Sequence, residues 1–235
     1  MTPGPQRISV VIPTLHEEEY IKRLLIRLVN MKPQPEIIVV DSDIKDTTVN
    51  IAREYTPKVY KSPERGISKA RNLGARKAEG DILVFLDADV TPPLDLTEKL
   101  LKSFEDESVV GVTCNIMPAK PTPVENAFFK FYNLLLKFCS LFVPHSRGEL
   151  LAARRDAFFK VGGFNEELSC LEDHDLAMRL SKLGRFIYND DMVVYESMRR
   201  FRKLGIRKVL SSWIANYLWL TIFGKPKDSE WRPIR

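Results

Sequence analysis

The sequence ILVFLDADV, residues 82–90, says the most about how this chain folds. Its five apolar residues, 82–86, predict a short strand that is buried on both faces, as in a parallel sheet. Asp87 and Asp89 follow directly, and two carboxylates one residue apart are costly to bury without a partner. Hard divalent cations such as Mg²⁺ or Mn²⁺ bind carboxylate oxygens and share them with substrate phosphates. The stretch therefore predicts a strand that ends at a cleft where a metal ion binds.

The segments before this strand alternate between strand-like and helix-like patterns. Apolar runs predict strands at 8–13, 36–40 and 59–61, and helical spacing of apolar residues predicts helices at 17–30, 47–55 and 67–78. This alternation indicates right-handed crossovers and a largely parallel sheet. Ligands of such sheets bind beyond the carboxyl ends of the strands. Pro13, Asp41 and Asp87 end three of the predicted strands, so we expect them to share one rim.

The second half of the chain is less regular but continues the same architecture. We expect a strand at 109–118, an apolar helix at 124–143 and a strand running into a short helix at 148–158. A turn before an acidic-headed helix follows at 161–184, short strands at 186–196 and a last apolar segment at 209–224. The predicted fold class is α/β, a mostly parallel central sheet flanked by helices.

Composition and short motifs exclude several classes of protein. With 235 residues and 44% hydrophobic content, the chain can bury the core of one large globular domain. Cys114, Cys139 and Cys170 lack metal-ligand spacing, and their odd number favours a reducing compartment over a disulfide framework. The start MTPGPQR has no apolar core of a signal peptide, so we expect the site to face the cytoplasm. No G-x-G-x-x-G follows the first strand and no G-x-x-x-x-G-K-S/T occurs, which excludes the common phosphate-binding loops.

Six short patterns occur in a fixed order along the chain. They are Pro13 with Glu17-Glu18, Asp41 with Asp46 and Thr48, Gly66 with Ala70-Arg71-Asn72 and Gly74, Asp87-Ala88-Asp89, Gly162-Gly163-Phe164 with Glu166, and Glu172-Asp173 with Asp175-Leu176. Together they resemble the family-2 glycosyltransferases, which have the GT-A fold, over about residues 8–205. The chain departs from the family after the second strand, where Ser42, Asp43 and Ile44 stand in place of a second Asp, a Gly and a Ser.

The resemblance implies inverting transfer of a sugar from a nucleotide-diphosphate sugar to a hydroxyl group. Asp89, supported by Asp87, would hold a divalent metal, Mn²⁺ or Mg²⁺, that neutralises the leaving diphosphate. Arg71 would reach the diphosphate or the nucleotide, because a guanidinium pairs well with phosphate oxygens. The remaining residues of the donor pocket would be Asp41, which would bond the nucleobase, with Pro13, Thr14 and Glu18.

The acceptor hydroxyl needs a general base, and the resemblance implies Asp173 for this role. Glu172 and Asp175 crowd it, and repulsion between carboxylates raises a pKa toward working pH. The simpler alternative is that these acids only complement the dipole at a helix N-terminus. The other expected acceptor or supporting residues are Glu172, His145, Arg199 and Arg200.

The C-terminal part combines basic and aromatic residues. Six of the ten residues from Arg199 to Lys208 are basic, and about 15 mostly apolar residues follow at 209–223. A spanning helix needs roughly 20 residues, so basic flanks and aromatics favour the membrane interface instead. The alternatives are packing on the domain or a dimer contact. We expect a catalytic domain at 1–200, with a donor half at 8–118 and an acceptor half at 119–200, and a membrane-associating segment at 201–235.

These patterns lead to one main functional hypothesis. It is a metal-dependent transferase at the cytoplasmic face of the cell membrane, peripheral or monotopic, that moves mannose from GDP-mannose to a lipid-linked acceptor. One alternative is a UDP-sugar-dependent relative acting on a glycolipid or polysaccharide precursor. A nucleotidyltransferase would need a Gly-rich loop that is missing here. A non-catalytic basic protein that binds membranes or nucleic acid is the alternative of another class, although we expect no nucleic-acid partner.

Overall fold

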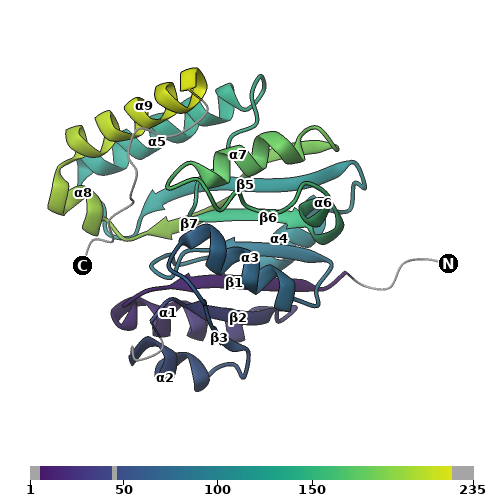
Figure 1. Cartoon of the computed structure of the whole chain (residues 1–235). Coiled ribbons are helices and arrows are strands. Elements are labelled where there is room, and N and C mark those ends of the chain that lie inside the picture. The colour runs from purple at the N-terminus through teal and green to yellow at the C-terminus, as the bar shows by residue number, and fades with distance from the viewer. Residues whose placement is uncertain (1–5, 44–46, 224–235) are drawn as a thin grey trace.

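A seven-stranded sheet forms the centre of the molecule in the computed structural model, which describes residues 6–43 and 47–223 (Figure 1). The strands lie in the order β3-β2-β1-β4-β6-β5-β7. Their bounds are β1 Ile8–Thr14, β2 Glu36–Asp41, β3 Val59–Lys61, β4 Ile82–Leu86, β5 Val109–Pro118, β6 Leu150–Arg154 and β7 Arg185–Glu196. The helices are α1 Glu18–Val29, α2 Thr47–Arg53, α3 Ile67–Lys77, α4 Leu96–Ser103, α5 Pro123–Cys139, α6 Arg155–Lys160, α7 Glu172–Leu180, α8 Arg199–Leu204 and α9 Ile206–Phe223.

The first four strands are parallel, as the alternating pattern predicts. β1 lies between β2 and β4, and its last residue, Thr14, pairs with Asp41 at the end of β2. Because parallel strands end at the same edge, this register brings Thr14, Asp41 and the residues after β4 to one rim. The prediction of a mostly parallel α/β sheet is confirmed.

In the second half of the sheet, the sequence pattern does not predict the direction of every strand or the continuity of β7. β6 runs antiparallel to both β4 and β5, whereas β5 pairs in parallel with β7. The expected short strands at 186–196 form one strand, β7, whose register shifts between Asn189 and Val193. This irregularity takes residues 190–192 out of the pairing, which explains why the region reads as several short strands.

Both faces of the sheet are covered by apolar side chains of the flanking helices. On one face α1 buries Ile21, Leu24, Leu25 and Leu28, and on the other α3 packs closely against the sheet. A Cβ atom added at Gly74 of α3 would lie 2.3 Å from Cγ1 of Val11, so only glycine permits this approach. The family signature residue Gly74 therefore has a packing role.

Helices α5 and α9 lie side by side along one end of the sheet (Figure 1). Asn133 of α5 donates from Nδ2 to the backbone oxygen of Ile116 (2.9 Å), which fixes α5 to β5. A capping box between Thr122 and Glu125 begins α5, and the helix ends at Cys139 rather than at residue 143 as predicted. In the part of the chain that the structure describes, no helix is long and apolar enough to cross a membrane.

Candidate active site

The residues of the candidate site come from the carboxyl ends of the strands and from the loops that face them. Asp87 and Asp89 follow β4, and Gly148 and Glu149 precede β6. Glu172 and Asp173 begin α7, opposite this rim. The fold thus brings together two acidic motifs that lie more than eighty residues apart in the sequence.

Arg71 connects these two motifs. Its side chain is only 1% exposed, and it donates from Nη1 to Glu172 Oε1 (2.8 Å) and from Nη2 to Asp87 Oδ1 (2.7 Å). Nη2 also donates to the backbone oxygen of Gly148 at 3.0 Å. A buried guanidinium needs such partners, because an unpaired buried charge is strongly destabilising. In the structure the Arg71 guanidinium bonds Asp87 and Glu172. Direct contact of Arg71 with the donor stays a prediction.

Asp89 is held by a second guanidinium, that of Arg199. Nε of Arg199 lies 3.2 Å from Asp89 Oδ2, and Nη2 donates to Glu17 Oε1 at 2.7 Å. Glu18, predicted to line the donor pocket, is exposed in the first turn of α1. The carboxylate that enters the site from this segment is therefore Glu17, which sequence analysis did not select.

The two carboxylates after β4 suit a divalent metal. Burial raises the pKa of Asp87 to about 7 and that of Asp89 to about 6, while Arg71 and Arg199 respectively oppose the shift. Within residues 6–43 and 47–223 there is no group of three or more candidate ligands, so the protein supplies few of the oxygens that a metal needs. This donor set fits Mn²⁺ or Mg²⁺, which accept carboxylates together with phosphate oxygens of a substrate.

The predicted donor residues at the ends of β1 and β2 form one hydrogen-bonded unit. The hydroxyl of Thr14 donates to Asp41 Oδ2 at 2.6 Å, and the backbone N–H of Asp43 donates to Asp41 Oδ1 at 2.6 Å. Asp41 is buried and Pro13 is half-buried beside it. This arrangement fixes the Asp41 carboxylate at the rim despite the altered loop that follows it.

A cavity of about 440 Å³ adjoins Asp173 and is lined on its polar side by Arg71, Asp87, Glu149, Glu172 and His174. Burial, followed by the charge of Glu172, raises the pKa of Asp173 well above its usual range, while Arg71 opposes the shift. Of the two carboxylates predicted to crowd Asp173, Glu172 contributes to this shift, whereas Asp175 pairs with Arg179, and burial is the larger cause. A carboxyl with a raised pKa can accept a proton near neutral pH.

Two imidazoles line the same cavity. The rings of His145 and His174 lie 5.1 Å apart, and the ring of Tyr217 from α9 lies 5.3 Å from His174. Burial lowers the pKa of His145 to about 3 and also lowers that of His174, so both rings are neutral at physiological pH. His145 therefore lines the same cavity as Asp173, and its role as an acceptor contact stays a prediction.

Arg200, the last predicted supporting residue, lies near Asp87 and Asp89. The charges of Asp87 and Asp89 raise the pKa of its guanidinium, but burial and the neighbouring Arg199 lower it by more. Arg199 and Arg200 thus contribute positive charge to the rim and do not belong to an exposed basic face.

An ion-pair cluster outside the sequence motifs contains two buried residues, Arg147 and Glu196, and the half-buried Glu149; Arg147 and Glu149 line the cavity. Nη2 of Arg147 lies 2.8 Å from Glu149 Oε1 and 3.1 Å from Glu196 Oε1. Its guanidinium also lies 5.7, 5.3 and 5.7 Å from the ring centroids of Phe129, Tyr132 and Trp213. The sequence offers one signal for this cluster: Arg147 and Glu149 lie just before the apolar strand β6, much as Asp87 and Asp89 lie just after β4. Their partners come from β7, α5 and α9, which no local pattern predicts.

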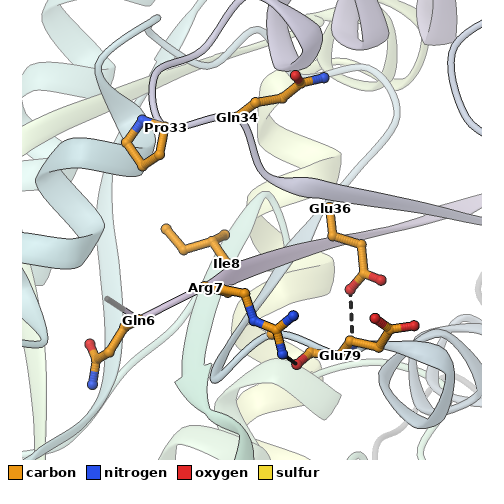
Figure 2. A pocket seen from close by; sticks show the side chains of 8 residues that line it. Gln6, Arg7, Ile8, Pro33, Gln34, Glu36 and Glu79 are labelled. Carbon is orange, nitrogen blue, oxygen red and sulfur yellow. Dashed lines mark hydrogen bonds between the residues drawn. The ribbon is translucent and has the colours of Figure 1, made fainter. Parts of the chain in front are cut away.

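A second cavity of about 330 Å³ lies at the opposite edge of the sheet, near the starts of β1 and β2 (Figure 2). Its two glutamates are already paired, since the backbone N–H of Glu79 donates to Glu36 Oε2 at 2.9 Å and Lys58 pairs with both carboxylates. We therefore assign it no role in the candidate site.

Comparison with known proteins agrees with this geometry. A dolichol-phosphate mannosyltransferase of Pyrococcus furiosus is 30% identical over 171 residues, which cover 67% of this chain and 45% of that protein. The glycosyltransferase AglE of Haloferax volcanii is 28% identical over 84% of this chain and 69% of its own length. A solved mannosyltransferase of Pyrobaculum calidifontis, in complex with GDP-Man and Mn²⁺, superposes with a TM-score of 0.70 at 26% identity, covering 89% of this chain and 64% of that one.

The family model gives the same result from the sequence. The chain spans less than half of the Pyrococcus relative, so these similarities describe the shared domain. The model of glycosyl transferase family 2 matches residues 9–163, which is more than half of the chain and includes the rim of β1, β2 and β4. With its GT-A fold, this protein belongs to glycosyl transferase family 2.

Proposed function

We propose that this protein is an inverting, metal-dependent glycosyltransferase that moves mannose from GDP-mannose to a lipid-linked acceptor. The observation that carries the proposal is the bridge through Arg71, which bonds Asp87 on the donor side and Glu172, next to Asp173, on the acceptor side. One buried side chain thereby holds the two halves of the site in a fixed relation.

The reaction follows from the two sides of this bridge. Asp173 accepts the proton of the acceptor hydroxyl while that oxygen forms a bond to the anomeric carbon of the sugar. The bond from the same carbon to the diphosphate breaks on the opposite face, so the configuration inverts. A divalent cation bound by Asp89 and Asp87 would neutralise the charge of the departing diphosphate. The raised pKa of Asp173 suits a base that works near neutral pH.

The choice of GDP-mannose rests on the relatives. The Pyrobaculum structure contains GDP-Man and Mn²⁺, and the Pyrococcus relative is a mannosyltransferase. A UDP-sugar is the alternative donor, and the loop after Asp41 departs from the usual family pattern at the point expected to contact the base.

A lipid-linked acceptor is supported by the apolar side of the cavity. Tyr132 and Leu136 of α5, Val143, and Trp213 and Tyr217 of α9 line it opposite the carboxylates. Outside the cavity, α5 and the turn after it expose a further set of apolar side chains, Phe131, Leu134, Leu135, Phe138, Leu141 and Phe142. Surfaces of this kind mark membrane or protein contacts. We extend the proposal to association with the cytoplasmic membrane face, where the exposed Lys203, Arg207 and Lys208 would meet anionic lipids.

Calorimetric titration of GDP-mannose and a panel of UDP-sugars, with and without Mn²⁺, tests the donor side directly. We expect one donor to bind wild-type protein only with Mn²⁺ and to lose its affinity in Asp89→Ala. Asp95→Ala serves as a control, because Asp95 lies in the same region of the chain but only flanks α4 and pairs with Lys99. Absence of binding by every nucleotide sugar would contradict the proposal and favour a non-catalytic role.

A further inference from the structure

The guanidinium of Arg199 contacts Asp89, the carboxylate that we propose as a metal ligand. Arg199 contacts Asp89 Oδ2 through Nε at 3.2 Å and Glu17 Oε1 through Nη2 at 2.7 Å, so one cation bridges two carboxylates. The ring of Tyr20, 4.8 Å away, covers it from α1. Arg199 belongs to α8, Glu17 to the loop before α1 and Asp89 to the loop after β4. Arg199 and Glu17 lie 182 positions apart in the sequence.

The surroundings of this contact are strongly acidic. The charges of Glu17, Asp87, Glu149 and Glu196 all act on Asp89 or on its immediate neighbours, and Arg199 is the cation with the largest effect on Asp89. Arg200 adds a second positive charge nearby. Without compensation such a cluster would be costly, because buried like charges repel each other.

We infer that Arg199 is a resident counter-cation of the metal site, which holds Asp89 in place before the metal binds and must release it when the metal binds. The inference rests on the proposed function, because it takes Asp89 to be a metal ligand. The guanidinium of Arg199 pairs with Asp89 Oδ2, and its positive charge opposes a second cation at the same carboxylate. Arg199 and the metal therefore compete for Asp89.

Glu17 gives the released side chain a place to remain. Its Oε1 accepts from Arg199, while its Oε2 is buried without a hydrogen-bond partner among the residues that the structure describes. Arg199 can therefore leave Asp89 and stay bonded to Glu17. Arg199 begins α8, and Gly205 at φ 83° joins α8 to α9, the helix that supplies Trp213 and Tyr217 to the 440 Å³ cavity.

A purely structural ion pair would behave differently. If Arg199 only stabilised the fold, its removal would leave Mn²⁺ affinity unchanged, or lower it by disordering Asp89. Competition instead requires that removal of the positive charge strengthens Mn²⁺ binding. By reciprocity, Mn²⁺ must loosen the Arg199 contact by the same factor.

The test is a Mn²⁺ titration of the full chain without nucleotide, followed by the electron paramagnetic resonance signal of free Mn²⁺. We expect Arg199→Gln to bind Mn²⁺ about tenfold more tightly than wild type, because the competing charge is gone. Arg199→Lys keeps a cation in the cluster and is expected to stay within about twofold of wild type. Arg202→Gln is the matched control on the same helix, where Arg202 pairs with Glu125 instead, and its affinity should be unchanged.

Two further measurements keep the inference falsifiable. Hydrogen exchange of the α8 amides should become faster when Mn²⁺ is added to wild type, a readout that does not depend on any variant folding correctly. If Arg199→Gln, folded by circular dichroism, binds Mn²⁺ no more tightly than wild type, the inference is overturned. If Asp89→Asn binds Mn²⁺ as well as wild type, the metal assignment in the proposed function is wrong, which is a separate failure.

Discussion

At the scale of single residues, Arg71 is the side chain on which the site depends most. It is buried with two carboxylates and a carbonyl oxygen as partners. Truncation in Arg71→Met would leave Asp87 and Glu172 facing each other without the guanidinium. Breaking such a buried pair costs about 3–5 kcal/mol, and we expect the free energy of unfolding, measured by urea denaturation, to fall by that amount.

The matched control for this prediction lies on the same helix. Arg76 of α3 is exposed, and Arg76→Met should change the free energy of unfolding by less than about 0.5 kcal/mol. Equal effects of the two substitutions would show that the Arg71 bridge contributes little to stability. Arg71→Lys should remain destabilised, because a single ammonium cannot reproduce a guanidinium that bonds two carboxylates at once.

Asp173 gives a prediction for the pH dependence of transfer. Its pKa is raised by burial and by Glu172, and only the ionised carboxylate can accept a proton. At pH values below this pKa the carboxyl is protonated and inactive, so kcat/KM should rise with pH and level off above the pKa. Asp173→Asn should lower kcat at least about 100-fold at pH values above this pKa, remove the rise of the rate with pH and keep donor binding.

A neighbouring acid provides the comparison for Asp173. Asp175 lies two positions further along α7, but its Oδ2 pairs with Nη2 of Arg179 at 2.5 Å and it does not line the cavity. Asp175→Asn should keep the shape of the pH profile. A flat profile in wild type, or equal loss in both variants, would exclude Asp173 as the base.

Whether a site residue could be predicted from the sequence depended on where its partners lie. Asp87, Asp89 and Asp173 stand out because acids follow or open recognisable elements. Glu17 and Arg147 do not, since what distinguishes them is burial against Arg199, Glu149 and Glu196 from distant segments. The role of Arg71 toward the donor stays a prediction, and its contacts with Asp87 and Glu172 required the fold, because a sequence does not show which carboxylates a long side chain reaches.

At the scale of elements, the pair α5 and α9 is held to the sheet by Arg147. Trp213 of α9 packs against Tyr132 and Phe201 and covers the Arg147 guanidinium. Trp213→Ala should lower the free energy of unfolding by about 3 kcal/mol, as for large aromatics in cores. Because Trp213 also lines the acceptor cavity, the KM for the acceptor should rise while donor affinity stays unchanged.

Trp219 offers a control for this prediction, since it lies on the same helix with 40% of its side chain exposed. Trp219→Ala should leave the urea midpoint close to that of wild type. If Trp213→Ala weakens donor and acceptor binding equally, α9 supports the whole site rather than the acceptor cavity.

The elements themselves were predictable where local pattern and tertiary position agree. β1, β2 and β4 read as apolar runs because they lie in the middle of the sheet and are buried on both faces. The eight-residue helix α4 was not predicted, and the antiparallel direction of β6 could not be, because strand direction depends on pairing with β4 and β5. The division of the chain at residue 200 stays a prediction, although Phe201 and Val209 pack into the same core as the sheet.

At the scale of the whole molecule, α5 and α9 lie side by side along one end of the sheet (Figure 1). Both helices line the 440 Å³ cavity, and α5 also carries exposed apolar side chains. An acceptor with an apolar chain could lie along α5 with its polar end at Asp173. In this arrangement the carboxylates lie at the rim of the sheet, and the apolar walls of the cavity come from α5 and α9. The face that carries α5 and α9 would then meet the membrane.

This arrangement gives a prediction for membrane binding. Phe138, Leu141 and Phe142 are 58%, 75% and 73% exposed at the end of α5. Burial of such side chains in the interface contributes up to about 1.5–3 kcal/mol each, so replacing all three with Ser should lower the fraction that sediments with anionic vesicles at least about tenfold. Leu94→Ser, at a site with 50% exposure beside α4, is the control and should bind as wild type does.

The same three side chains could instead form a contact between two copies of the chain, and the experiment separates these cases. With membrane association, wild type and the triple variant are both monomeric in analytical ultracentrifugation without lipid. Added salt then weakens vesicle binding, because Arg207 and Lys208 are exposed in the first turn of α9. With a dimer contact, wild type is dimeric without lipid, the triple variant is monomeric, and neither depends on anionic vesicles. The second result would remove the main structural support for a lipid-linked acceptor, while leaving the Arg71 bridge and the metal carboxylates as the basis of the transferase assignment.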